Sequence, residues 1–435
     1  MKNTLIDYNT VTSVVESFNI SNFATATIRE IVAIVNKLEA LTGQRFVRME
    51  MGVPGLKPAK IGVDAEIEAL QKGVASVYPM LDGLSTLKTE AARFIKAFVD
   101  VNVEPAHCIP AAGSMQGTYV SFLTSCQANP QKNKVLFIDP GFPVQKQQLT
   151  VMGYAYESFD VYDFRGEKLK AKLESYLAKG DIAAVIYSNP NNPAWISLND
   201  SELQIIGELA TKYDVIVLED LAYFAMDFRK DLSKPFQAPF QPSVAHYTDN
   251  YILLISSSKV FSYAGQRVGI VGISDKLYER NFEGLKNRYG VAGFGNVLVN
   301  RILYSLSSGT GHSAQYALAA MFKAASDGKF DFLEEMKEYA RRAEKMKKLF
   351  LENGFQLVYE KDLDEPIGDG FYFTLKYKNM PGAELMKELI FYGISAISLD
   401  TTGSCQQGLR ACTSFIKDDQ YGDLEERLKR FSKDH

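Results

Sequence analysis

A single lysine in a run of small hydroxyl residues is the side chain best suited to covalent chemistry. Lys259 follows three serines at the end of the apolar run Tyr251–Ile255, where partial burial lowers the pKa of an amine and makes it a nucleophile. Arg267 lies eight positions further along, just before a second apolar run, and a guanidinium grips a phosphate through a fork of hydrogen bonds. An amine that can form an imine beside a phosphate-binding arginine indicates pyridoxal phosphate (PLP).

Further polar groups follow apolar runs that we interpret as strands of one sheet. Asn192, Asp220 with Tyr223, and Phe142 each come shortly after such a run, and ligands of open α/β sheets bind beyond the carboxyl ends of the strands. The turn Ala112-Gly113-Ser114 precedes a helix-like segment, where backbone N–H groups and a hydroxyl can bind an anion. We therefore expect these groups to gather around the same ligand as Lys259.

The elements that must position these groups alternate along the middle of the chain. Short apolar runs alternate with helix-like segments from about residue 65 to residue 304, which is typical of a mostly parallel sheet flanked by helices. Continuous apolar runs indicate strands that are covered on both faces; they span residues 135–138, 184–187, 215–218, 252–255 and 268–271. Periodicity predicts helices over residues 22–41, 169–178 and 200–213.

The pattern changes from residue 312 onward. A charged amphipathic stretch at 314–353 precedes short strand-like runs and a helix at 383–391, which predicts a smaller α+β unit joined by one long helix. We expect an α/β protein of three parts: an N-terminal helix and loop (1–60) that packs with the small domain, a large cofactor-binding domain (61–310) and a C-terminal small domain (311–435).

The composition disfavours several other classes of protein. The formal net charge is -4, from 48 basic and 52 acidic residues without an extended basic tract, so nucleic-acid binding is not favoured. No apolar run approaches the roughly 20 residues that span a bilayer, and the N-terminus lacks a signal-peptide core. The four cysteines show no metal-ligand spacing and the four histidines are scattered, which predicts buried thiols, no metal and a cytoplasmic location.

The ordered set of motifs resembles the class I/II aminotransferases, PLP-dependent enzymes of fold type I related to aspartate aminotransferase. The resemblance covers nearly the whole chain and rests on the identity, order and spacing of Tyr78-Pro79, Gly113-Ser114, Asn192-Pro193, Asp220 with Tyr223, Ser256 to Lys259, Arg267 and Arg410. It implies a seven-stranded, mostly parallel sheet flanked by helices with a smaller α+β domain. It also implies amino acid and 2-oxo acid substrates and a homodimer.

The resemblance implies a role for each catalytic residue. Lys259 would form an aldimine with the cofactor and later carry the proton that leaves the substrate's Cα, which needs a neutral amine. Asp220 would pair with the pyridinium nitrogen, so that the ring accepts electrons. Asn192 and Tyr223 would hydrogen-bond the 3′ oxygen of the cofactor, and Phe142 would stack on its ring.

The same resemblance assigns the two anion-binding ends of the site. Ala112, Gly113, Ser114, Ser256 and Arg267 would hold the cofactor phosphate, together with Tyr78 reaching over from the neighbouring subunit. Arg410 would bind the substrate α-carboxylate in a bidentate pair, and charged hydrogen bonds of this kind contribute about 1.5–3 kcal/mol each. Gly52 would let the substrate approach closely, beside Asn192.

The sequence also leaves alternatives open. Ala194-Trp195 follows Asn192-Pro193 where a small residue and glycine are common in the family, and we expect Trp195 and the N-terminal segment to limit the size of the pocket. A carbon–sulfur β-lyase of the same fold would share these motifs, and a PLP-binding scaffold would retain some of them. Taken singly, Lys259 could be a solvated surface charge and Asp220 an ordinary helix cap.

Overall fold

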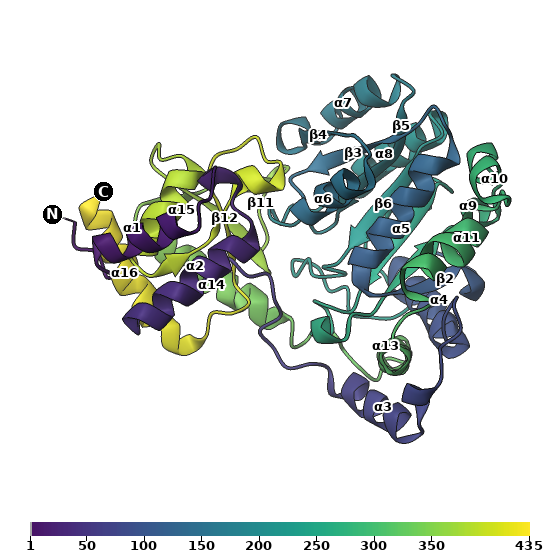
Figure 1. The fold of residues 1–435 in the computed structure, drawn as a ribbon, viewed down its shortest axis with the longest axis horizontal. Helices are drawn as coiled ribbons and strands as arrows, with labels where there is room; N and C mark the ends of the chain where they lie inside the picture. Colours follow the sequence, from purple (N-terminus) through teal and green to yellow (C-terminus); the bar gives the residue numbers. More distant parts are fainter. Residues whose placement is uncertain (1) are drawn as a thin grey trace.

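The computed structural model describes residues 2–435, which form two lobes (Figure 1). One lobe contains the large sheet, and the other contains both chain termini. Two stretches of chain connect the lobes: the segment after β1 (Val47–Arg48) and the segment between α13 (His312–Ser326) and α14 (Lys337–Glu352). The site predicted from the sequence therefore draws residues from both lobes.

The large lobe is built on a seven-stranded sheet, as predicted. All neighbouring strands are parallel except β8, which runs antiparallel to both of its neighbours. The spatial order is β2 (Cys108–Ala111), β8 (Gly269–Ile273), β7 (Tyr251–Ser256), β6 (Ile216–Leu221), β5 (Ile182–Ser188), β3 (Lys134–Asp139) and β4 (Tyr156–Asp160). The five predicted strands are confirmed, whereas β2 and β4 were not anticipated.

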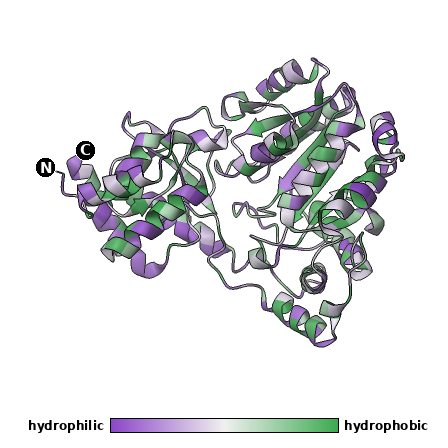
Figure 2. Cartoon of the chain, in the orientation of Figure 1, coloured by the Kyte–Doolittle hydropathy of each residue, from purple (hydrophilic) through white to green (hydrophobic). Residues whose placement is uncertain are grey.

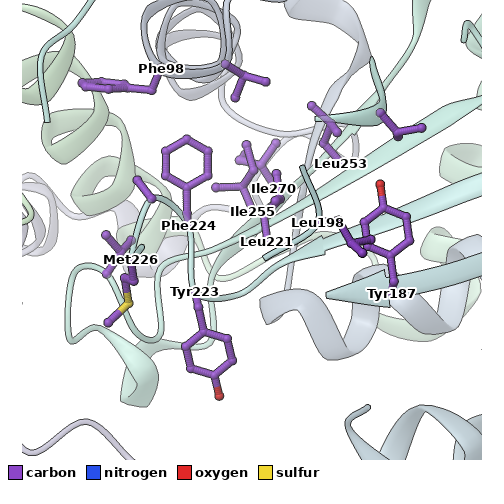
Figure 3. Close-up of a cluster of buried hydrophobic side chains, with 14 of the residues drawn as sticks. Phe98, Tyr187, Leu198, Leu221, Tyr223, Phe224, Met226, Leu253, Ile255 and Ile270 are labelled. Carbon is purple, nitrogen blue, oxygen red and sulfur yellow. The ribbon is translucent and has the colours of Figure 1, made fainter. Parts of the chain in front are cut away.

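In the central strands β3, β6 and β7, alternate apolar side chains enter separate hydrophobic clusters on the two faces of the sheet. In β7, Leu253 and Ile255 belong to the cluster that also contains Phe98 (Figure 3). Ile252 and Leu254 belong to the opposite cluster, beneath α5 (Gly113–Ala128). Each such side chain contributes about 1.5–3 kcal/mol on full burial. This two-sided burial explains why the strands read as unbroken apolar runs, and Figure 2 shows hydrophobic residues along them.

Helices cover both faces of this sheet. The predicted helices at 169–178 and 200–213 are α7 (Lys168–Leu177) and α8 (Asp200–Lys212), and α8 begins at a capping box formed by Asn199 and Glu202. The remaining helices of the lobe are α3 (Lys60–Gln71), α4 (Ser85–Val99), α6 (Pro143–Met152), α9 (Asp275–Glu279), α10 (Glu283–Tyr289), α11 (Phe294–Val297), α12 (Tyr304–Ser307) and α13. Because α13 packs against α3 and α4, it lies with the large lobe although it follows the expected boundary at residue 310.

The small lobe combines an antiparallel sheet with helices from both ends of the chain. The sheet has the order β14 (Ile397–Ser398), β15 (Leu409–Cys412), β12 (Tyr372–Tyr377) and β9 (Phe355–Leu357). One hydrophobic cluster unites it with α1 (Tyr8–Ser17), α2 (Ile28–Thr42), α14, α15 (Gly382–Phe391) and α16 (Tyr421–Asp434). β1 pairs in parallel with β13 (Ile394–Ser395), so the N-terminal segment packs in this lobe.

Two helix predictions need correction. The helix expected from residue 22 begins at Ile28, because the Thr27 hydroxyl accepts from the Glu30 N–H while the Glu30 carboxylate accepts from the Thr27 N–H. A second N-terminal helix, α1, precedes it. The stretch at 314–353 is not one helix: it is divided into α13 and α14 around Gly328, whose φ of 69° is left-handed.

Two further statements from the sequence can be compared with the structure. Cys108, Cys126 and Cys412 are buried as expected, but Cys405 is exposed, since it lies in the loop before β15. Within residues 2–435 no helix has both the length and the apolar character needed to cross a bilayer.

A buried ionic network holds the two lobes together near the loop of Asn192. Asp362 of the small hairpin β10 (Lys361–Asp362) and β11 (Glu365–Pro366) accepts hydrogen bonds from Arg165 at 2.7 Å and Arg229 at 2.6 Å. The same carboxylate accepts the backbone N–H of Ser197 at 3.1 Å. Since removing one partner of a buried ion pair leaves an uncompensated charge, this network keeps the hairpin docked on the large lobe.

Candidate active site

A cavity of about 410 Å³ opens at the carboxyl ends of β5, β6 and β7, where the two lobes meet. It gathers ten of the residues predicted from the sequence: Gly52, Ser114, Phe142, Asn192, Asp220, Tyr223, Ser256, Lys259, Arg267 and Arg410. Ala112 and Gly113 lie directly beside it, at the start of α5. Residues that are up to 358 positions apart thus form one concave surface.

Lys259 lies just beyond the end of β7, with its amine at the lobe boundary. The Nζ atom donates a hydrogen bond to the carbonyl oxygen of Gly52 and lies 5.4 Å from the ring centroid of Phe371. Desolvation lowers the pKa of the amine from 10.5 to about 8, and the positive charges of Arg410 and Arg267 act in the same direction. A substantial fraction of the amine is therefore neutral near pH 8, as a nucleophile or base requires.

Asp220 presents a buried carboxylate to the same cavity. It is the fifth residue of β6 and 6% exposed. Its oxygens accept hydrogen bonds from the Gln145 side-chain amide at 2.8 Å and the Ala222 N–H at 3.1 Å. Burial raises the pKa of Asp220 to about 6, against the opposing effect of these two donors. Within residues 2–435 no cationic side chain pairs with this carboxylate, so it suits a cationic group in the cavity.

One end of the cavity is suited to a phosphate. The Ser114 hydroxyl in the first turn of α5 is buried and has no hydrogen-bond partner among residues 2–435. Arg267 donates to the Ala264 carbonyl oxygen at 3.0 Å and also approaches Gly113. Gly113 has φ +72°, and a Cβ there would lie 2.6 Å from the guanidinium, so the turn excludes a side chain. A helix N-terminus, a free hydroxyl and a guanidinium together fit a phosphate.

Another wall presents a buried guanidinium. Arg410 of β15 is 1% exposed, and its guanidinium carbon lies 4.9 Å from the ring centroid of Tyr372. It donates to the Glu50 carbonyl oxygen, whereas its Nε has no partner within the described residues. A buried guanidinium with an unused donor is suited to a carboxylate ligand.

Hydroxyl and amide groups lie between the charged walls. The side chains of Tyr223 and its neighbour Phe224 point in opposite directions (Figure 3), and the Tyr223 hydroxyl donates to that of Tyr372 at 2.8 Å. Burial raises the pKa of the Tyr223 hydroxyl well above 10, which keeps it protonated. The Asn192 N–H donates to the Ser188 hydroxyl at 3.2 Å, and Asn192 also lines the cavity.

Tyr78 and Trp195 lie outside the cavity of this single chain, whereas the N-terminal segment lines it. Tyr78 does not reach the cavity; its side chain is 89% exposed on the loop before α4. Trp195 does not line the cavity either. It is buried behind the site, edge-on to Tyr223 and Tyr372, and a Cβ at Gly370 would lie 2.1 Å from its ring. The N-terminal segment does line the cavity, through Ile28, Arg29 and Val32.

Several site residues were missed from the sequence. Gln145 and Tyr372 touch Asp220 and Tyr223, yet they lie 75 and 149 positions away in the chain. Gln145 belongs to an ordinary helical segment, and no local signal distinguishes it. Tyr372 lies in the aromatic run 371–373, which predicts a buried strand but not which ring faces a ligand.

Comparisons with known proteins identify the family. The family model described as "Aminotransferase class I and II" matches residues 50–427. The chain is 23% identical over 345 residues to the probable aspartate aminotransferase of Methanocaldococcus jannaschii, covering 79% of this chain and 82% of that protein. It is 24% identical over 254 residues to the asparagine–oxo-acid transaminase of Streptococcus mutans, covering 56% and 62%.

Solved structures share the fold. The alanine aminotransferase of Pyrococcus furiosus superposes with a TM-score of 0.76 at 17% identity, covering 94% of this chain and 97% of that one. The aspartate aminotransferase of Thermotoga maritima gives 0.74 at 17% identity, covering 93% and 96%. The chain belongs to the class I and II aminotransferases and has their fold, fold type I.

The close approach of Gly52 to Tyr372 gives a test of the site's geometry. A Cβ at Gly52 would lie 2.1 Å from the Tyr372 hydroxyl oxygen but 3.3 Å from the next ring carbon. We expect Gly52→Ala to displace Tyr372 and lower kcat/KM about 10-fold or more, since small displacements cost large factors in rate. Adding Tyr372→Phe, which removes the clashing oxygen, should restore part of the loss in steady-state assays.

The control for this pair is Gly265→Ala, because no atom lies within 4 Å of a Cβ built there. It should leave kcat/KM unchanged. A double variant no more active than Gly52→Ala alone would show that the clash with Tyr372 is not the cause.

The lowered pKa of Lys259 predicts how its reactivity depends on pH. The neutral amine is the reactive form, so its fraction rises as the pH passes the folded-state pKa of about 8 instead of 10.5. Treatment of cofactor-free protein with a small aldehyde and borohydride should modify Lys259 with a midpoint near pH 8. Peptide mass spectrometry at a series of pH values measures this midpoint.

Lys72 serves as the internal control, because its hydrogen bond to Glu68 raises the pKa of its exposed amine. It should be modified only at higher pH. A Lys259 midpoint at or above that of Lys72 would contradict the desolvated environment.

Proposed function

We propose that this aminotransferase uses PLP, held covalently through Lys259, to move the amino group of an L-amino acid to a 2-oxo acid in two half-reactions. The observation that carries the proposal is one cavity with a lowered-pKa amine, a buried carboxylate without a cation, and guanidinium groups on separate walls. The relatives named as aspartate aminotransferases support the class of reaction.

The residues present fit the cofactor. Ser114, Ser256 and Arg267 would hold the phosphate with the turn Ala112-Gly113, and the unpartnered Ser114 hydroxyl is free to do so. Asp220 would pair with the ring nitrogen, while Asn192 and Tyr223 would bind the 3′ oxygen. Phe142, which lines the cavity at the start of α6, would pack on the ring.

The chain's own groups then divide the work on the substrate. Bound PLP would supply two groups: one is an aldehyde that bonds to the substrate amine, and the other is a protonated ring that withdraws electrons from the carbon bearing that amine. Arg410 binds the α-carboxylate of the amino acid and, in the second half-reaction, that of the oxo acid. The neutral amine of Lys259 accepts the Cα proton of the first substrate and returns a proton to the Cα of the second. Gly52 leaves room for the substrate beside Asn192.

The products of the reaction test this function. The PLP-loaded protein is incubated with single L-amino acids, with and without a 2-oxo acid, and oxo acid, new amino acid and ammonia are quantified. We expect equal amounts of oxo acid and new amino acid, no ammonia, and turnover only when the second oxo acid is present. Lys259→Ala should lower the rate by about 10²–10⁴-fold, whereas the exposed Lys276→Ala should not.

The alternative reaction, elimination, would give different products. A carbon–sulfur β-lyase releases ammonia and needs no second oxo acid, so ammonia formed in proportion to oxo acid would replace the proposed function with elimination. The comparisons with known proteins favour transamination.

We also propose that the enzyme is a homodimer in which Tyr78 completes the phosphate site of the neighbouring subunit. Tyr78 lies among other exposed apolar side chains, including Val77 at 59% and Met80 at 71% exposure. Exposed apolar surface of this kind is typical of an interface. A second copy of the chain bound to this surface would receive Tyr78 at its phosphate site.

Subunit mixing tests the shared site. Tyr78→Ala and Lys259→Ala proteins should each have low activity, because each damages both sites of its own homodimer. Unfolded and refolded together, they should form mixed dimers with one intact site, restoring about one quarter of wild-type activity per subunit. The two variants refolded separately and then combined are the control. Absence of recovery despite mixed dimers on native mass spectrometry would mean that Tyr78 does not act across subunits.

A further inference from the structure

Arg29 is a cation of the cavity that the proposed chemistry leaves unused. Three arginines line the cavity within residues 2–435, and the proposed function assigns Arg267 to the phosphate and Arg410 to the α-carboxylate. Arg29 is the second residue of α2, and its side chain is exposed at the cavity. Within the described residues it forms no hydrogen bond or ion pair, so its charge is available to a ligand.

The position of Arg29 is fixed by the packing of its helix. The opposite face of α2 buries Ile31, Ile34, Val35 and Leu38 in the core of the small lobe. Ile28 and Val32, one turn apart, line the cavity with Arg29. The adjacent carboxylate of Glu30 is occupied by the Thr27 N–H at 2.7 Å and the Thr27 hydroxyl at 2.8 Å. Arg29 therefore faces the cavity without a neutralising partner from its own helix.

The charge of the cavity indicates what Arg29 binds. Asp220 is the only carboxylate that lines the cavity within residues 2–435, against the four cationic side chains of Arg29, Lys259, Arg267 and Arg410. The phosphate is assigned to Arg267 and the α-carboxylate to Arg410, so neither of these anions is assigned to Arg29. The lining near α2 is otherwise apolar, with Ile28, Val32, Met51 and Val53. This arrangement suits a short aliphatic side chain that ends in an anionic group.

We propose that Arg29 binds the distal carboxylate of the substrate and thereby selects dicarboxylic amino acids and their 2-oxo acids. The proposal rests on the transaminase function given above and adds its substrate class. It makes Arg29 a specificity-determining residue, which contacts the substrate side chain and leaves the reacting atoms to other groups. The same guanidinium serves both half-reactions, since each substrate carries the second carboxylate.

Paired substrates and variants test the proposal. With the PLP-loaded protein, kcat/KM is measured for aspartate and glutamate and for alanine, each with a saturating 2-oxo acid. Arg29→Gln removes the charge, and it should lower kcat/KM for the two acidic substrates by about 10- to 100-fold, the range for one charged hydrogen bond. The value of kcat/KM for alanine should change less than about threefold. Arg29→Lys keeps the charge but loses the forked geometry, so its kcat/KM for the acidic substrates should lie between those of the wild type and Arg29→Gln.

Binding of unreactive acids provides a readout that does not depend on turnover. Titration calorimetry of the same proteins with succinate should show a Kd about tenfold or more higher for Arg29→Gln, and butyrate, which lacks the second carboxylate, should not distinguish the proteins. Lys37→Gln is the matched control: it removes one positive charge from the same helix, and Lys37 contacts Ser17 and not the cavity. Lys37→Gln should behave as wild type in every assay.

The outcomes separate this proposal from the transaminase function. Equal losses for alanine and the acidic substrates, no loss for any of them, or a wild-type preference for alanine would overturn the role of Arg29 while leaving transamination intact. A wild-type protein that transaminates no amino acid would overturn the function on which the proposal rests. In that case succinate binding still decides whether Arg29 takes a dicarboxylate.

Discussion

The ionised carboxylate of Asp220, buried without a cationic partner, is the constraint around which the site is organised. Burial raises its pKa to about 6, so near pH 7 the Asp220 carboxyl is ionised in most molecules. A buried charge is costly unless it is paired, yet within residues 2–435 Asp220 receives only the neutral donors Gln145 and Ala222. The large sheet holds the carboxylate at the end of a central strand, where a cation that enters the cavity would stabilise it.

Neither lobe contains a complete site. The sheet supplies Asp220 and Lys259, whereas Arg410 and Tyr372 come from the antiparallel sheet of the small lobe. At the cavity, the hydrogen bond from Tyr223 to Tyr372 and that from Lys259 to the carbonyl of Gly52 cross the lobe boundary. The desolvation that lowers the pKa of Lys259 thus depends on how the lobes meet, and the network around Asp362 maintains that contact.

Where the sequence predicted well, the causes were local. Strands buried on both faces must be apolar at every position, so five strands of the large sheet were recognisable as unbroken runs. Because the carboxyl ends of parallel strands share one edge, polar residues just beyond such runs were expected to meet, and Asn192, Asp220 and Lys259 do line one cavity. The predicted role of Arg410 rested on the family resemblance, since its short strand gives little local signal.

What the sequence could not give depends on packing between distant segments. The amphipathic period runs through both α13 and α14, but α13 packs on the large lobe and α14 on the small one, so the chain must turn between them. Trp195 follows the Asn192 loop directly, and proximity in sequence suggested a wall of the pocket. Its left-handed backbone, with φ of 60°, directs it behind Tyr223, into space that Gly370 leaves open. Arg29 shows the converse, because its place at the cavity is set by the opposite, buried face of its helix. Periodicity identifies that buried face, but only the docking of α2 on the small lobe determines what the other face meets.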